Sequence, residues 1–287
     1  MRGIFLTLSS RRSLILGAGA AFIVRPVRAL IYPRNPLAYP GGNPGFNQNH
    51  IAAGYVQFSG VAQGSSFLRL DHSNVPTLTG SPVASIDGTL GPVIGVSGTQ
   101  VVTFGSSNGT TISNGFTLAA IIRNTSSATA GYVISDSALN VLEVTSTGIT
   151  IIVNNTKTLT LASVLTSGHP YFIAVTVKNV TNNPVFAVFC DLSSSVITTA
   201  SGNPGVTSQA AGSTVYVGNN ASGTVPFTGQ IAAAAILHNI IPDIAVVQWA
   251  SAPWDFWYPP TEQSLLFSSI ANPSPALPAF GGFMAHH

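Results

Sequence analysis

From Tyr55 onward, short runs of apolar and β-branched residues alternate with clusters of Gly, Asn and Ser, at a spacing of roughly 8–12 residues. Runs of this length between turn residues are typical of an antiparallel sandwich or jelly roll, and not of alternating strand–helix units. We therefore predict an all-β fold, an antiparallel β-sandwich with one short C-terminal helix and extended arms at both ends.

Two of the runs predict where strands lie in the sheets. Alternate residues of 171–178 are large and apolar, which predicts one face towards a core. The run 185–190 is apolar on both faces and predicts a central strand, in which Cys190 is a small buried hydrophobe. The predicted strands cover residues 54–58, 67–70, 100–104, 116–123, 131–135, 139–145, 149–153, 157–161, 170–178, 184–190, 194–199, 213–218 and 227–238.

One helix is predicted after the last strand. Pro242 is expected at the first helical position and Asp243 in the first turn, where the helix dipole favours a carboxylate. Pro253 ends the run. The expected apolar stripe consists of Ile244 and Val247, with Val246 or Ala250.

Charge is scarce and unevenly placed. Asp, Glu, Lys and Arg make up 6% of the chain, and six of the ten basic residues lie within the first 34 positions. From Ile31 onward five basic residues stand against eight acidic ones, a net charge near −3. No basic stripe remains in this part, which argues against nucleic acid as a partner. The single cysteine excludes an intrachain disulfide.

The N-terminus resembles an export signal. Basic residues precede an apolar run from Leu14 to Val24 and a small-residue site at Ala29, and Arg11-Arg12 resembles a twin-arginine signal. The apolar run is too short for a transmembrane segment. Cleavage after Ala29 is favoured over an uncleaved arm that docks on a neighbouring subunit. The predicted division is a leader at 1–29, a Pro/Gly-rich linker at 30–50, the sandwich at 51–260 and a Pro-rich tail at 261–287.

Several segments, in order, resemble concanavalin A-like domains of the laminin G type. They are residues 115–122, 165–176, 215–219, 227–232 and the Ala252-Pro253-Trp254 sequence, and the resemblance covers about residues 54–260. It implies two packed antiparallel sheets that bind glycans or proteins at loops or on the concave face. Chains of this kind also resemble virion surface or tail-associated proteins of tailed phages.

Motifs for hydrolysis are weak. A glycosidase on this fold needs two facing carboxylates, whereas Glu143 and Glu262 lie far apart in the sequence and nothing places Asp136 on the same face as Glu143. The sequence Gly105-Ser106-Ser107-Asn108-Gly109 matches a nucleophile elbow in form but leads into another strand, so a turn is expected. We predict no catalytic residues and no enzyme.

Metal sites are not expected either. The histidines show no zinc-ligand spacing. Calcium occurs in some relatives of this type, but no dense acidic loop exists, so no cofactor is predicted. Isolated oxygen ligands for calcium are available at Asp71, Asp87, Asp136, Asn140 and Asp191.

The densest aromatic cluster follows the helix. Trp249 and Trp254 are expected to pack against the sandwich, whereas Phe256, Trp257 and Tyr258 are the candidates for a ligand or partner interface. Rings of this kind stack on sugars or anchor a neighbouring subunit.

Three functions remain open. The first is a non-catalytic virion surface component, for decoration or at the tail, that mediates assembly and glycan adhesion. The second is a carbohydrate-binding protein exported through the twin-arginine route. The third, opposed by the missing acid pair, is a degenerate glucanase-like enzyme. The expected partners are virion subunits or cell-surface glycans, in a homo-oligomer or larger assembly on a virion or outside the cytoplasm.

Overall fold

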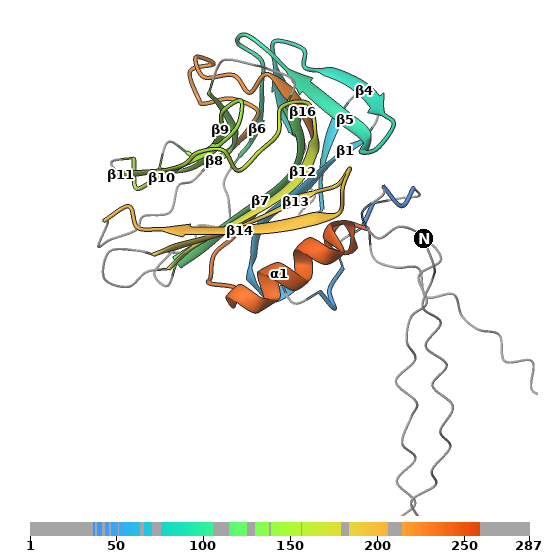
Figure 1. Ribbon diagram of the computed structural model, residues 1–287. Helices are drawn as coiled ribbons and strands as arrows, with labels where there is room; N and C mark the ends of the chain where they lie inside the picture. Colours follow the sequence, from blue (N-terminus) through green and yellow to red (C-terminus); the bar gives the residue numbers. More distant parts are fainter. Residues whose placement is uncertain are drawn as a thin grey trace, which may run out of the picture. The chain divides into compact units, whose positions relative to one another are not determined.

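A computed structural model describes the chain at residues 37, 39–41, 44–45, 47–50, 52–63, 66–70, 76–105, 115–124, 130–137, 139–155, 157–178, 184–205 and 214–258. Two antiparallel sheets face each other and form a sandwich, and one helix lies on the outside (Figure 1). The predicted all-β sandwich with one short helix is therefore confirmed. The leader and the tail, with Arg11, Arg12 and Ala29, lie outside the described residues.

The larger sheet has nine strands in the order β14-β13-β12-β7-β16-β1-β2, with β5 also paired to β16 and β4 paired to β5. Its strands are β1 (Val56–Gln63), β2 (Ser66–Arg69), β4 (Val83–Asp87), β5 (Gly91–Val96), β7 (Gly115–Asn124), β12 (Pro170–Lys178), β13 (Val185–Asp191), β14 (Val196–Gly202) and β16 (Gly229–Leu237).

The smaller sheet has seven strands in the order β11-β10-β9-β8-β15-β6-β3. Its strands are β3 (Thr77–Thr79), β6 (Val101–Phe104), β8 (Gly131–Asp136), β9 (Asn140–Val144), β10 (Ile149–Val153), β11 (Lys157–Leu161) and β15 (Val215–Val217).

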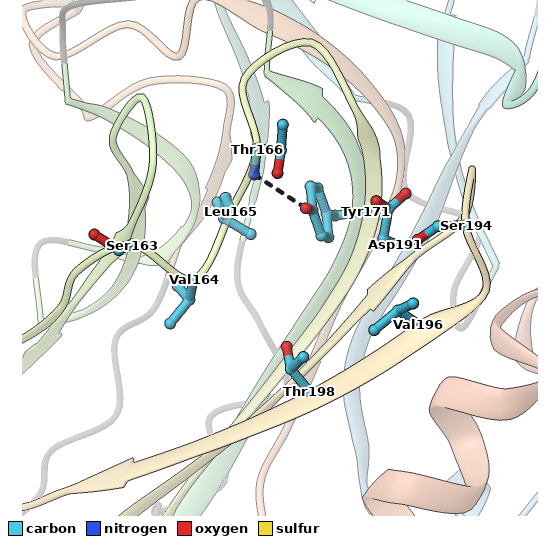
Figure 2. A pocket seen from close by; sticks show the side chains of 9 residues that line it. All are labelled: Ser163, Val164, Leu165, Thr166, Tyr171, Asp191, Ser194, Val196 and Thr198. Carbon is cyan, nitrogen blue, oxygen red and sulfur yellow. Dashed lines mark hydrogen bonds between the residues drawn. The ribbon is translucent and has the colours of Figure 1, made fainter.

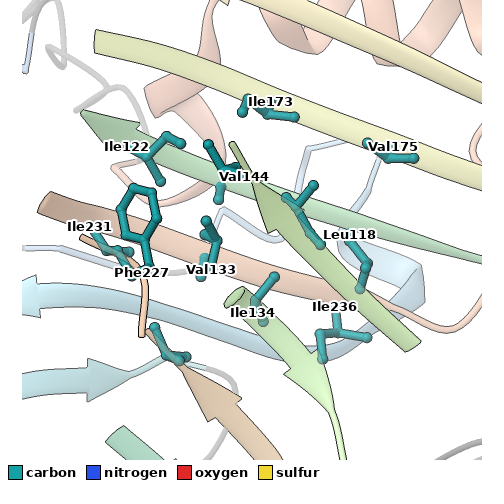
Figure 3. Close-up of a cluster of buried hydrophobic side chains, with 14 of the residues drawn as sticks. Leu118, Ile122, Val133, Ile134, Val144, Ile173, Val175, Phe227, Ile231 and Ile236 are labelled. Carbon is teal, nitrogen blue, oxygen red and sulfur yellow. The ribbon is translucent and has the colours of Figure 1, made fainter. Parts of the chain in front are cut away.

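The main core lies between the two sheets. Leu118 of β7, Ile134 of β8 and Ile173 of β12 all point into it and are fully buried (Figure 3). Alternate residues of β12 contribute to this core, so the predicted inward face of residues 171–178 is confirmed.

A second hydrophobic cluster covers the outer face of the nine-stranded sheet. Here the helix α1 (Asp243–Ser251) packs over β12 and β13, and the short 3-10 helix η2 (Pro253–Phe256) lies against α1 in the same cluster. Phe172 and Cys190 face this cluster, and both are fully buried. The central strands are apolar on both faces because each face meets a packed layer. The predicted burial of Cys190 is confirmed.

A clasp of hydrogen bonds joins the start of the described chain to its end. Trp254 Nε1 donates to the carbonyl of Leu37 at 3.2 Å, and the amide of Gly45 donates to the carbonyl of Trp257 at 2.9 Å. The rings of Tyr39 and Tyr258 meet edge to face at 5.3 Å between centroids. These contacts hold the described residues of the segment at 37–50 against the residues that follow α1.

The helix forms where it was predicted, and the expected apolar stripe is confirmed in part. Val246 and Ala250 are buried, together with Ala245 and Trp249, and Val247 is partly buried against the same cluster, whereas Ile244 is 68% exposed. Pro242 is the N-cap residue and not the first helical residue. Ile244 is not part of the buried stripe because Trp249, the largest side chain of the helix, packs its ring against Phe172. The side of the helix that carries Trp249 therefore faces the sheet.

Every predicted strand overlaps an observed one, and three further strands were missed. The missed strands are β3, β4 and β5, which lie between residues 77 and 96. β4 and β5 form a hairpin that is attached to the sheet through β16.

Candidate functional site

A shallow cavity of about 280 Å³ opens between the edges of the two sheets, where β14 diverges from the loop at 162–169. At the other end of β14, Gly202 lies close beneath Leu159 of β11, which closes the sandwich there. Figure 2 shows the loop on one side and the turn between β13 and β14 on the other. The lining residues are Ser163, Val164, Leu165, Thr166, Tyr171, Asp191, Ser194, Val196 and Thr198.

The loop wall is held by backbone hydrogen bonds to neighbouring strands. The amide of Leu165 donates to the carbonyl of Thr147 at 2.9 Å, and the amide of Thr166 donates to the Tyr171 hydroxyl at 3.0 Å (Figure 2). Gly168, at a φ of 81°, turns the chain back into β12. These bonds hold the loop against the neighbouring strands at Leu165 and Thr166.

Arg123 supports this loop from outside the cavity. Its Nη1 donates to the carbonyl of Gly168 at 2.8 Å, while Nε and Nη2 form a bidentate pair with Asp87 at 2.8 and 2.9 Å. Burial acts to raise the pKa of Asp87, but hydrogen bonds from Arg123 and from the amides of Leu90 and Thr89 hold it below its ordinary value. The pair links the β4–β5 hairpin to the cavity loop.

Asp191 supplies the charge at the cavity. Its Oδ2 lies 2.8 Å from His169 Nδ1, and its Oδ1 accepts from the amide of Ser193 at 2.8 Å. Burial acts to raise the pKa of Asp191, but these hydrogen bonds and one from Ser194 hold it below its ordinary value. An ionised carboxylate therefore lies beside the hydroxyl groups of the cavity.

The sequence contained a signal for the His169–Asp191 pair. His169 precedes the start of β12 and Asp191 ends β13, and neighbouring antiparallel strands bring the start of one next to the end of the other. The pair was missed because the histidines were considered only as zinc ligands and Asp191 only as an isolated calcium ligand.

The lining of the cavity contains one carboxylate, that of Asp191, and not the two facing carboxylates that a glycosidase needs. Elsewhere, Asp136 pairs with Asn140 and Glu143 with Tyr132, so the carboxylates lie near opposite ends of the β8–β9 pair. Asp136 shares the inward face with Ile134, whereas Glu143 points outward. Burial raises the pKa of Glu143.

The aromatic residues predicted as an interface lie in the core. Trp257 and Phe256 are fully buried and Tyr258 is 6% exposed, all within the cluster outside the nine-stranded sheet. This corrects the expectation that they are open to a partner, because the segment at 37–50 covers them. Trp249 and Trp254 are buried as predicted.

The calcium candidates are dispersed. Asp87 and Asp191 are engaged by Arg123 and His169, while Asp136 and Asn140 lie together but are buried. Asp71 and most of the Gly-x-Ser-x-Gly turn lie outside the described residues. Among the residues that the structure describes, no three His, Cys, Asp or Glu side chains gather as a metal site. Nor is any described helix long and apolar enough to cross a bilayer.

No family model matches the chain, and no curated protein sequence is similar to it. Among solved structures, it is similar to the binding domain of Paraclostridial Mosquitocidal Protein 1, with a TM-score of 0.52 and 9% identity over 70% of this chain and 53% of that one. The botulinum neurotoxin serotype C1 binding domain follows with a TM-score of 0.50, 8% identity, and 70% and 52% coverage. The chain thus spans about half the length of these two structures.

A third solved structure is the enzymatically active domain of bacteriophage CBA120 tailspike protein 2. Its TM-score is 0.44, with 16% identity over 62% of this chain and 30% of that one, which is too low to support a conclusion. The two higher matches confirm the sandwich fold alone. The resemblance to laminin G-type domains remains a prediction.

Proposed function

We propose that the protein is a non-catalytic recognition protein that binds neutral glycans at the cavity beside β14. The observation that carries this proposal is the chemistry of the lining, which combines the single carboxylate of Asp191 with five hydroxyl side chains. The five are those of Ser163, Thr166, Tyr171, Ser194 and Thr198.

Sugars suit such a lining. Carboxylate and hydroxyl oxygens exchange hydrogen bonds with sugar hydroxyls, and the apolar side chains of Val164 and Val196 offer contact to the C–H faces of a ring. The cavity is small and open at the surface, which favours one terminal sugar residue over a long chain. The two higher structural neighbours are named as binding domains, in agreement with a binding role.

We place this protein on the surface of a phage-like virion, as a decoration or tail-associated subunit. The scarce charge, the arginine-rich N-terminal segment and the Pro-rich tail agree with a subunit held by its neighbours. Export through the twin-arginine route is the second candidate. The intact mass of natural material separates them, because export predicts a chain that begins near Leu30 and a virion arm predicts one that begins near Met1.

A glycan array probed with the full chain tests the binding role. Thr198→Trp fills the cavity from β14 and is expected to abolish the signal. The matched control is Thr158→Trp on β11, an exposed position on a strand at the edge of the other sheet, which should bind as the unaltered chain does. Silence of the unaltered chain on the array would remove the glycan-binding role. Loss of binding in the Thr158→Trp variant alone would move the site to the outer face of the seven-stranded sheet.

A further inference from the structure

Within the described residues the two sheets end in five edge strands, and four of these are shorter than the fifth, β14. β3 has three residues, β2 has four, and β4 and β11 have five each. β2 and β4 also end at a charged residue, Arg69 and Asp87. Short length and inserted charge are the devices by which sheet proteins prevent their edges from pairing with other chains. These four edges therefore follow the expected pattern for a strand that faces water.

β14 does not follow that pattern. Its seven residues, Val-Ile-Thr-Thr-Ala-Ser-Gly, contain no charge and no proline, and its register with β13 runs unbroken from Asp191↔Val196 to Val185↔Gly202. Val196 and Ile197, on opposite faces of the strand, are 52% and 36% exposed. Within the described part of the chain, no strand pairs with the outer side of β14. A long, regular, uncharged edge that carries exposed β-branched residues is suited to pair with another strand.

We propose that β14 is a homodimer interface, in which the β14 strands of two copies pair antiparallel about a twofold axis and join their nine-stranded sheets. β14 carries no charge, so a second β14 strand can pair with it without burying an unpaired charge. A charged peptide that paired with β14 would bury one. Twofold pairing also closes the assembly at this strand, because each copy pairs its β14 with the β14 of the other and leaves no unpaired β14 for further growth.

The pairing has a consequence for the cavity. Val196 and Thr198 of β14 line it, and a twofold axis perpendicular to the joined sheet keeps the inner faces of both copies on the same side. The dimer therefore carries two cavities that flank the shared edge. This consequence rests on the proposed glycan-binding function; the dimer itself does not.

Sedimentation velocity on the full chain, over a dilution series, tests the interface. The unaltered chain is expected to sediment with twice the mass of one subunit. Ile197→Lys combined with Thr199→Lys places like charges from both copies on one face of the paired strands, and the mass is expected to halve. The matched control is Val83→Lys with Ser85→Lys on the exposed edge strand β4, which should leave the dimer intact.

A charge-reversal experiment guards against a variant that merely fails to fold. Ile197→Glu with Thr199→Glu should be monomeric alone, and mixing it with the double lysine variant should restore the doubled mass. Hydrogen exchange should show the β14 amides that point away from β13 protected in the unaltered chain and exchanging in the lysine variant. A monomeric unaltered chain, including one whose own termini cover β14, would overturn the proposal, and so would a lysine variant that stays dimeric. Glycan binding is scored separately, so a dimer that binds no glycan refutes only the proposed function.

Discussion

Nδ1 of His169 lies 2.8 Å from Oδ2 of Asp191 at the mouth of the cavity, and the two side chains differ in exposure, at 44% and 12%. The carboxylate is the more enclosed partner and is held by the hydrogen bonds that form around it. Its removal should therefore affect stability as well as binding.

Asp191→Asn is expected to lower the free energy of unfolding at neutral pH by about 1–2 kcal/mol, because the hydrogen bonds to a charged acceptor are lost. The pKa of Asp191 is held below its ordinary value, so its stabilising effect is present at neutral pH and is lost as the pH falls through that lowered pKa. Urea unfolding at several pH values measures this. Asp243→Asn, at the more exposed pair with Lys178, should cost less than about 1 kcal/mol.

The burial of His50 predicts a second effect of pH on the free energy of unfolding. Its ring lies against Trp249 and Phe256, with centroids 5.2 Å away in each case, and burial lowers its pKa to about 4. The unfolded chain binds a proton near pH 6.5, whereas the folded one does not, so the free energy of unfolding should fall between pH 6.5 and 4, by at most about 3 kcal/mol. His50→Phe should flatten this fall in urea titrations, and the half-buried His238→Gln control should retain it.

Cys190 provides a probe of the folded state. Burial and the adjacent charge of Asp191 raise the pKa of its thiol to about 11. We expect a disulfide reagent at pH 8 to label the native chain at least about 100-fold more slowly than the unfolded one. Absorbance of the released thiolate measures both rates, and rapid labelling of the native chain would show that β13 is not enclosed.

A substitution at Trp257 distinguishes a ring that stabilises the core from one that contacts a partner. Trp257→Ala should lower the free energy of unfolding by about 3–5 kcal/mol, since it removes a fully buried ring. Ile244→Ala, at a 68% exposed position on α1, should change it by no more than about 0.5 kcal/mol. If Trp257→Ala left thermal unfolding unchanged, the covering segment at 37–50 would not be in place.

Arg123→Lys tests the support of the cavity loop. Lysine cannot reproduce the bidentate pair with Asp87 and the bond to Gly168 together, so we expect a loss of about 1–2 kcal/mol and faster hydrogen exchange at residues 165–168. Lys178→Arg, at a more exposed pair, should change neither quantity appreciably. Unchanged exchange in the Arg123→Lys loop would mean that the backbone bonds alone hold it.

Much of the fold could be predicted because the central strands carry their own signal. Residues 171–178 and 185–190 are apolar in the pattern that a sheet covered on both faces requires, and both strands formed there. The segment from 77 to 87 lacks that signal: β4 is mostly exposed and β3 entirely so, and a strand exposed to water needs no apolar alternation. β5 is mostly buried, but Gly91, Pro92 and Gly95 interrupt its apolar residues.

The site was harder to predict than the fold. Trp257 and Tyr258 are buried by residues some two hundred positions earlier in the chain, a contact that no local pattern encodes. The cavity in turn depends on where the two sheets separate, which brings Ser163, Asp191 and Thr198 from three separate segments together. Hydroxyl residues of this kind are common throughout the sequence and carry no signal individually.

The clasp between the segment at 37–50 and the residues after α1 has a mechanical consequence. If the protein were pulled by the segments that precede Leu37 and follow Tyr258, the force would act on the hydrogen bonds from Trp254 to Leu37 and from Gly45 to Trp257. The force would not act on the two sheets while these bonds hold. Pulling would then open the clasp and expose the tryptophans while the sandwich stays whole.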